Sequence, residues 1–110
     1  MKLIVAVVQG NDGDALLDGL TSRGYRATRI SSAGGFLRES NVTLLIGVSE
    51  SYVVDVLRII REHCHSRVRF VNPLMPIMEP GEFYMANPVE VVVGGATVFV
   101  LAVERYERIA

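Results

Sequence analysis

The sequence predicts a single α+β domain that spans residues 1–110 and has the order strand, helix, strand, strand, helix, strand. Short runs of β-branched and apolar residues predict the strands, and apolar residues at helical spacing predict the two helices. Breaks that contain glycine or serine separate these elements, and no repeat or linker divides the chain. The order is that of the split βαβ, or ferredoxin-like, arrangement.

The N-terminal segment contains the first strand and the first helix. Residues 2–9 are nearly all apolar and rich in β-branched side chains, which predicts a strand buried on both faces. The polar break after this strand offers Asn11 or Asp12 as the N-cap of a helix. Apolar residues then recur at helical spacing until Gly24, where we expect the helix to stop.

Two further strands follow this helix. Residues 25–31 are expected to form the second strand, and the apolar residues 42–48 are expected to form a third, buried strand. Between them, residues 32–35 are small and flexible, and residues 36–41 form a short tip.

The second predicted helix follows the third strand. Ser49 or Ser51 is expected to cap it, and it is expected to end near His65. Its apolar face is predicted to consist of Val53, Val54, Val56, Leu57, Ile59 and Ile60.

The C-terminal part of the chain combines a long loop with a hairpin. Residues 66–88 contain all four prolines and are expected to form a long ordered loop before the last strands, with a short strand at 68–71. Residues 89–93 and 96–103 predict two strands of a hairpin that turns at the glycine pair between them. The tail after this hairpin is expected to form a helical turn.

The composition indicates a cytoplasmic globular protein. A formal net charge of -1 provides no overall field that would attract a nucleic-acid polymer or a membrane. The single cysteine, Cys64, excludes an internal disulfide framework. The apolar N-terminus is too short to cross a membrane and lacks the cleavage site of a signal peptide. We therefore expect no membrane insertion and no binding of nucleic-acid polymers.

The stretch between Asp18 and Glu39 has the character of an anion site. It contains positive charges and no negative ones, and it includes the glycine pair at 34–35. Its arginines are Arg23, Arg26, Arg29 and Arg38. Cations beside backbone amides that glycine leaves accessible are the combination that a phosphate site needs.

Within this stretch, the alternation of a strand places Arg26 and Thr28 on the same face, where a cation and a hydroxyl can meet one ligand. Phe36 and Leu37 are suited to form the wall of a base site, and Asn41 has the paired donor and acceptor that match an adenine edge. The alternative interpretation of these residues is a solvated surface strand beside a flexible hairpin.

Signatures of catalysis and of metal binding are missing from the sequence. No serine lies in a G-x-S-x-G context, and no G-x-x-x-x-G-K-[ST] loop occurs. His63, Cys64 and His65 are consecutive, so on a helix they point in different directions and do not close on one ion. We therefore predict a binding protein with no catalytic residues, no metal site and no cofactor, and not an enzyme.

Five segments of the chain carry a further signal: residues 25–30, 34–38, 41–43, 46–48 and, above all, 88–100. In these segments the chain resembles the cyclic-di-AMP receptor family, which consists of PII-like signalling proteins of bacteria. The resemblance runs from Lys2 to about Val103. It implies a PII-like homotrimer with three nucleotide sites at the subunit clefts, a shortened loop at about 36–41 and an enlarged loop at about 67–88.

The resemblance also implies the residues that contact the ligand. They are Arg26, Ala27 and Thr28 on the strand under the ligand, Gly35, Phe36 and Leu37 above it, Asn41 and Gly47 at a base, and Phe99 from the last strand. Together these expectations describe a signalling receptor that binds cyclic-di-AMP at the trimer clefts. Binding would change loop order and thereby regulate an unknown downstream protein.

Two alternatives to this function are kept. The first is a PII-like sensor of another adenine nucleotide, such as ATP or ADP, because the chain departs from the family at two places. Residues 77–79 are Ile-Met-Glu where the family usually has Met-Gly-Gly, and Arg108 stands where the family's tail commonly has Gln. The second alternative is a small ferredoxin-like enzyme that uses the acidic residues of the long loop.

Overall fold

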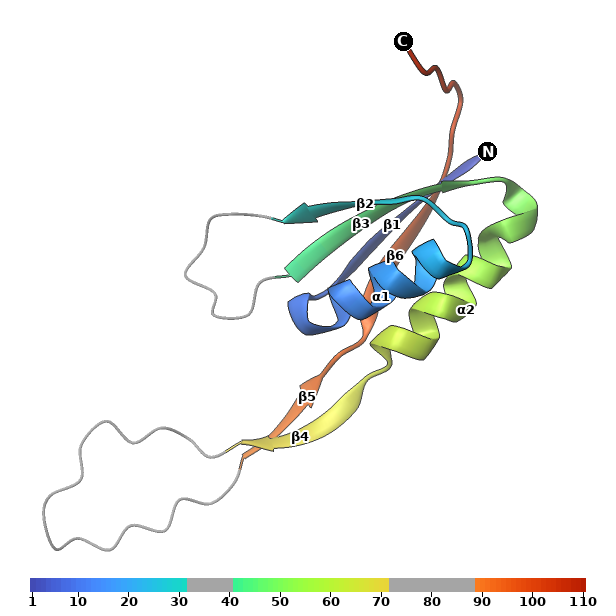
Figure 1. Ribbon diagram of the computed structural model, residues 1–110. Coiled ribbons are helices and arrows are strands. Elements are labelled where there is room, and N and C mark those ends of the chain that lie inside the picture. Colours follow the sequence, from blue (N-terminus) through green and yellow to red (C-terminus); the bar gives the residue numbers. More distant parts are fainter. Residues whose placement is uncertain (32–40, 72–88) are drawn as a thin grey trace, which may run out of the picture.

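The computed structural model describes residues 1–31, 41–71 and 89–110 as a mixed α+β fold. The elements are β1 (Lys2–Gln9), α1 (Gly10–Ser22), β2 (Ala27–Ser31), β3 (Asn41–Val48), a 3₁₀ turn (Glu50–Tyr52), α2 (Val53–Cys64), β4 (Arg67–Val71), β5 (Val89–Val93) and β6 (Ala96–Ala102). Four strands form an antiparallel sheet in the order β2-β3-β1-β6, and both helices cover one face of it (Figure 1). We call this sheet with its helices the body. The ribbon of β4 and β5 projects from it and is called the arm.

The core lies between the sheet and the helices of the body, an arrangement that agrees with the predicted ferredoxin-like fold. β1 is central, so Ile4 stands opposite Ile46 on one side and Val100 on the other. Alternate residues of β1 and β3 point toward the helices and are buried. The largest fully buried side chains are Ile4, Val8, Leu16, Leu20, Val42, Leu44, Ile46 and Val56. Burial of this apolar surface is the main source of stability, at roughly 25 cal/mol per Å².

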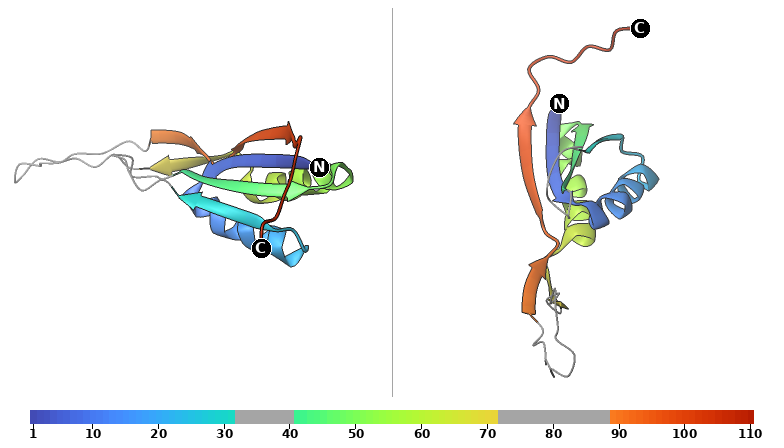
Figure 2. Two further views of the ribbon diagram at one scale, coloured as in Figure 1. Left: turned by 90° about the horizontal axis from the view of Figure 1, so that it is seen from above. Right: turned by 90° about the vertical axis from the view of Figure 1, so that its left-hand side faces the viewer.

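The prediction that residues 2–9 form a strand buried on both faces is correct for only one face of β1. Ile4 and Ala6 face the helices and are fully buried, whereas Val5 and Val7 are only partly buried. Within the described residues both helices lie on the same side of the sheet (Figure 2), and neither of them covers the opposite face. The apolar run therefore reflects a sheet that is apolar on both faces and covered on one.

The start of α1 also corrects the prediction. The helix begins directly after Gln9, so Asn11 and Asp12 lie inside its first turn and do not cap it. The Gln9 side-chain oxygen instead accepts a hydrogen bond from the backbone N–H of Gly94, at 2.8 Å. Asp12 is buried, and its Oδ1 lies 3.1 Å from the guanidinium of Arg67. These polar residues therefore hold the base of the arm against the body.

The ends of the helices are closer to the prediction than their starts. α1 is followed by Gly24 at a φ of 85°, and α2 ends at the expected position. α2 begins after Tyr52, so the expectation that Ser49 or Ser51 caps it is wrong. Ser49 precedes the 3₁₀ turn, where its carbonyl oxygen accepts a hydrogen bond from Tyr52 N at 2.9 Å. Val54 was expected on the apolar face but is 75% exposed, because it points away from the sheet.

The prediction that residues 89–93 and 96–103 form a hairpin is wrong. β5 pairs with β4 in the arm, whereas β6 pairs with β1 in the body. Gly94 and Gly95, both at a φ of 83°, join the two strands without reversing the chain, and β6 continues onward from β5 (Figure 2). The short strand expected at 68–71 is confirmed as β4. The tail after β6 is irregular and not helical.

Two expected loops fall largely outside the described residues, which omit 32–40 and 72–88. Of the tip expected at 36–41, the structure describes Asn41 alone, as the first residue of β3. Neither helix of the described ranges is long and apolar enough to cross a membrane.

Candidate functional site

A hollow at one end of the sheet brings together three of the predicted ligand residues. The ladder of β2 and β3 places Thr28 opposite Leu45 and, one step before the paired residues, Arg26 beside Gly47. These four residues line a hollow of about 400 Å³, which we call the Arg26 hollow. Its other lining residues are Met1, Leu3, Val103 and Tyr106. An apolar floor with a cation and a hydroxyl at its edge suits a ligand that combines a flat ring with an anionic group.

The two faces of β2 are divided as the alternation predicts. Arg26 and Thr28 are exposed on the open face, whereas Ala27 packs against the core. Arg29 points to the helix side and pairs with Asp14 of α1. The side chain of Ala27 therefore points away from the Arg26 hollow. Within the described residues Arg29 has an ion-pair partner and Arg26 has none, which leaves the Arg26 guanidinium free to bind an anion.

The other predicted ligand residues lie elsewhere on the chain. Asn41 pairs with Gln9 at the opposite end of β3, about 20 Å from Gly47 at roughly 3.3 Å per residue. Phe99 lies on the open face of β6, and two strands separate it from Thr28, a distance of about 14 Å. One chain thus brings together Arg26, Thr28 and Gly47 but not Asn41 or Phe99. Gly35, Phe36 and Leu37 lie outside the described residues.

A second hollow, of about 460 Å³, adjoins the first. We call it the Arg23–Tyr52 cleft, and its lining residues are Arg23, Gly24, Tyr25, Arg26, Gly47, Val48, Ser49 and Tyr52. Arg26 and Gly47 line both hollows, so the two spaces meet at this pair. This cleft is not apparent from the sequence, because Tyr52 and Arg26 come to line one space only after the chain has folded. The one local signal was an aromatic residue, Tyr25, directly before Arg26.

A polar network behind this cleft fixes the position of Tyr25. Its hydroxyl donates a hydrogen bond of 2.5 Å to Oδ2 of Asp55 on α2. Arg23 contacts Oδ1 of the same carboxylate at 3.1 Å, and Arg58 contacts it as well. The hydrogen bond from Tyr25 and the contact with Arg58 lower the pKa of Asp55, and the hydrogen bond to Asp55 raises the pKa of Tyr25. At neutral pH the phenol is therefore a donor to an ionised carboxylate, and the start of β2 is tied to α2.

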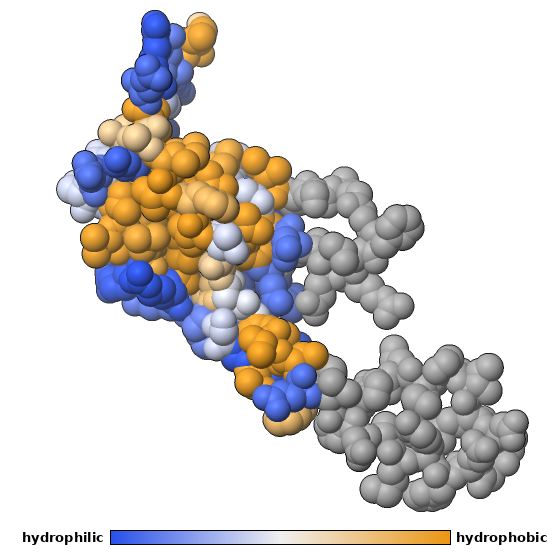
Figure 3. All heavy atoms as spheres, turned by 180° about the vertical axis from the view of Figure 1, so that it is seen from behind, coloured by the Kyte–Doolittle hydropathy of each residue, from blue (hydrophilic) through white to orange (hydrophobic). Residues whose placement is uncertain are grey.

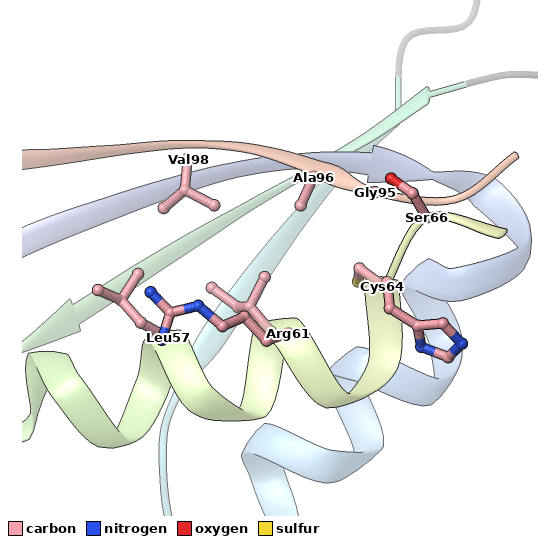
Figure 4. A pocket seen from close by; sticks show the side chains of 9 residues that line it. Leu57, Arg61, Cys64, Ser66, Gly95, Ala96 and Val98 are labelled. Carbon is pink, nitrogen blue, oxygen red and sulfur yellow. The ribbon is translucent and has the colours of Figure 1, made fainter. Parts of the chain in front are cut away.

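A third hollow, of about 340 Å³, lies between α2 and β6, and Cys64 is one of its lining residues. Figure 4 shows Leu57 and Cys64 on α2 opposite Ala96 and Val98 of β6. Burial raises the pKa of the Cys64 thiol to about 11, so it is protonated at neutral pH and packs as a small apolar group. In the described ranges no three His, Cys, Asp or Glu side chains are grouped to hold a metal ion.

Comparison with known proteins identifies the family. The family model described as "Cyclic-di-AMP receptor" matches residues 1–109. The chain belongs to the cyclic-di-AMP receptor family. The crystal structure of a functionally unknown protein from Pediococcus pentosaceus ATCC 25745 is similar to this chain, with a TM-score of 0.72 and 41% sequence identity. The similarity covers 98% of this chain and 96% of the other.

The face of the sheet opposite the helices is called the open face. It is the largest apolar surface in Figure 3. Ile30, Phe99 and Leu101 are 47%, 53% and 49% exposed on β2 and β6. The register places partly buried Leu3 and Val5 of β1 between them. A contiguous apolar face of this kind is typical of a surface that another protein chain covers.

Proposed function

We propose that this chain is a signalling receptor that binds cyclic-di-AMP at clefts between the subunits of a homotrimer in the bacterial cytoplasm. The observation that carries the proposal is the Arg26 hollow, in which Arg26, Thr28 and Gly47 line one space in a chain of the cyclic-di-AMP receptor family. The proposal assigns binding, and no catalysis or cofactor, to this site.

The chemistry of the hollow suits the ligand. Cyclic-di-AMP combines two phosphates with two purines, so its site needs cations, hydrogen-bond donors and flat apolar walls together. Charge-assisted hydrogen bonds from Arg26 contribute about 1.5–3 kcal/mol each, and stacking of a base on an aromatic ring contributes about 1–3 kcal/mol. These contributions are sufficient for micromolar affinity, about -8 kcal/mol, after the cost of ordering is subtracted.

The separation of the predicted residues supports a site shared between two chains. Asn41 and Gly47 lie at opposite ends of β3, and Phe99 is displaced across the sheet from the Arg26 hollow. A ligand that contacts all of them therefore needs the Asn41 end of one chain beside the Gly47 end of another. In this proposal Gly35, Phe36 and Leu37 complete the site, and Ala27 contributes through its backbone.

The open face of the sheet supports the homotrimer. Its apolar residues remain exposed in one chain, and covering them with neighbouring sheets removes this surface from water. Ligand binding then biases the order of the loops at 36–41 and 67–88, and a downstream protein recognises the difference.

The test is isothermal titration of cyclic-di-AMP into wild type, Arg26→Ala and Arg29→Ala. We expect Arg26→Ala to weaken binding by about tenfold or more, because it removes a charge-assisted contact. Arg29→Ala is the matched control, since it removes the same charge from the other face of β2. It is expected to bind as wild type does. Equal heats from wild type and Arg26→Ala would remove Arg26 from the site.

A further inference from the structure

The Arg23–Tyr52 cleft has the chemistry of a nucleotide site and contains residues that the family resemblance did not indicate. Two guanidinium groups, Arg23 and Arg26, and two phenol rings, Tyr25 and Tyr52, line the same space of about 460 Å³. The cleft opens at the start of β2 and the end of β3. The cleft and the Arg26 hollow share only two lining residues, Arg26 and Gly47.

We propose that the Arg23–Tyr52 cleft is a second subsite of the receptor, which binds a purine-phosphate part of the nucleotide through Arg23 and Tyr52. The inference rests on the proposed function, because it assigns a further part of the same ligand. It adds two ligand-contacting residues on the side of Arg26 that faces away from the Arg26 hollow.

The geometry supports a ligand that spans both spaces. Because Arg26 and Gly47 line both hollows, a phosphate held by the Arg26 guanidinium has room for a nucleoside on either side. Gly47 carries no side chain where the two spaces meet, and a Cβ added there would lie 3.5 Å from Cε of Met1, so a ligand can approach the Gly47 backbone closely. A ligand with two purines and two phosphates matches two adjoining spaces better than either space alone.

The charge of the cleft favours an anion. No acidic residue is among the described residues that line the cleft, and the Asp55 carboxylate behind it already binds Arg23, Arg58 and the hydroxyl of Tyr25. Arg26 is outside this network, so within the described residues the positive charge that lines the cleft exceeds the negative charge. The Arg23 side chain is half exposed, which leaves part of its planar donor set available to a phosphate.

The aromatic wall has one fixed ring and one free ring. Tyr25 is held by its hydrogen bond to Asp55 and contacts Tyr52 edge to face, with ring centroids 6.0 Å apart at 67°. Tyr52 keeps 53% of its surface exposed while it lines the cleft. A purine stacked on Tyr52 would cover this exposed ring, as bases do on aromatic platforms.

Isothermal titration of cyclic-di-AMP into two matched pairs of variants tests the subsite. Arg23→Ala and Arg58→Ala each remove a half-exposed arginine from Asp55, but only Arg23 lines the cleft. Tyr52→Ala and Val54→Ala each truncate an exposed apolar surface at the start of α2, but only Tyr52 lines the cleft. We expect Arg23→Ala to weaken binding by about tenfold and Tyr52→Ala by about fivefold or more, while both controls bind as wild type does. Thermal melts check that all four variants are folded.

The outcomes separate the subsite from the proposed function. Wild-type affinity in Arg23→Ala and Tyr52→Ala, together with weakened binding in Arg26→Ala, overturns the subsite and leaves the proposed function in place. Equal losses in Arg23→Ala and Arg58→Ala also overturn it, because the effect would then belong to the Asp55 network. A wild-type protein that gives no heat with cyclic-di-AMP, ATP or ADP overturns both proposals. Binding of ATP or ADP alone, weakened in Arg23→Ala, keeps the subsite and changes the nucleotide.

Discussion

The body and the arm of the molecule are stabilised in different ways. Every buried apolar residue of the described chain belongs to the body, where the helices cover one face of the sheet. The arm consists of two paired strands, and its Val68, Phe70 and Val92 are all more than half exposed. An isolated two-stranded ribbon is marginally stable in water. The body therefore folds around its own core, whereas the arm depends on what it contacts.

Polar contacts join the two regions at the base of the arm. Asp12 of α1 binds Arg67 at the start of β4, and Gln9 of β1 binds the backbone of Gly94 at the end of β5. Gln9 also pairs with Asn41, which is one of the predicted ligand residues. The base of the arm thus lies next to one end of the proposed site. A region with little core of its own, joined to the site by a few contacts, is suited to respond to a ligand.

The largest expected effect is on the free energy of unfolding, and it compares a buried residue of the body with an exposed residue of the arm. Leu44→Ala removes a fully buried side chain from the body and is expected to lower the free energy of unfolding by about 2–5 kcal/mol. Val92→Ala removes apolar atoms from the arm, where Val92 is 70% exposed, and is expected to change it by less than about 0.5 kcal/mol. Urea unfolding at a fixed protein concentration measures both values. A comparable loss in the two variants would show that another chain covers the arm.

The sequence predicted the body better than the arm, for a physical reason. β1 and β3 are near-continuous runs of apolar residues, many of them β-branched, and α2 repeats apolar residues at helical spacing, so each of these elements could be recognised from the sequence. In the arm, strands were expected at 68–71 and 89–93, but their pairing with each other was not predicted. Its glycine pair was also ambiguous, because a hairpin turn and the link between β5 and β6 both require positive φ at two successive residues.

For the candidate site too, features that depend on neighbouring residues could be predicted from the sequence, whereas contacts between distant residues could not. Strand alternation was sufficient to place Arg26 and Thr28 on one face, and the structure confirms it. The contact of Tyr25 with Tyr52 and Asp55 depends on how α2 packs against the start of β2. No spacing rule connects residues so far apart in the chain. Such contacts can be found only after the packing is known.

A second prediction addresses the link between the two regions. Gly94→Ala and Gly24→Ala both place an alanine at a φ above 80°, which costs about 1–2 kcal/mol. At Gly94 the added Cβ would also lie 2.5 Å from the carbonyl oxygen of His65, whereas at Gly24 nothing lies within 4 Å. We therefore expect Gly94→Ala to lower the free energy of unfolding by about 2–4 kcal/mol, because overpacking adds to the strain. Similar losses for the two variants would show that the link has room to move.

The smallest expected effect concerns the ion pair between the arm and the body. A double-mutant cycle of Asp12→Ala and Arg67→Ala isolates the contribution of this pair to the free energy of unfolding. We expect a coupling of about 1 kcal/mol, because the Asp12 side chain is buried but that of Arg67 is 40% exposed and solvent screens it. Hydrogen exchange is expected to quicken in β4 and β5 of Arg67→Ala, while β1 and β3 exchange as in wild type. Unchanged exchange in the arm would mean that this ion pair does not hold it, and the hydrogen bond between Gln9 and Gly94 would then be the main tether.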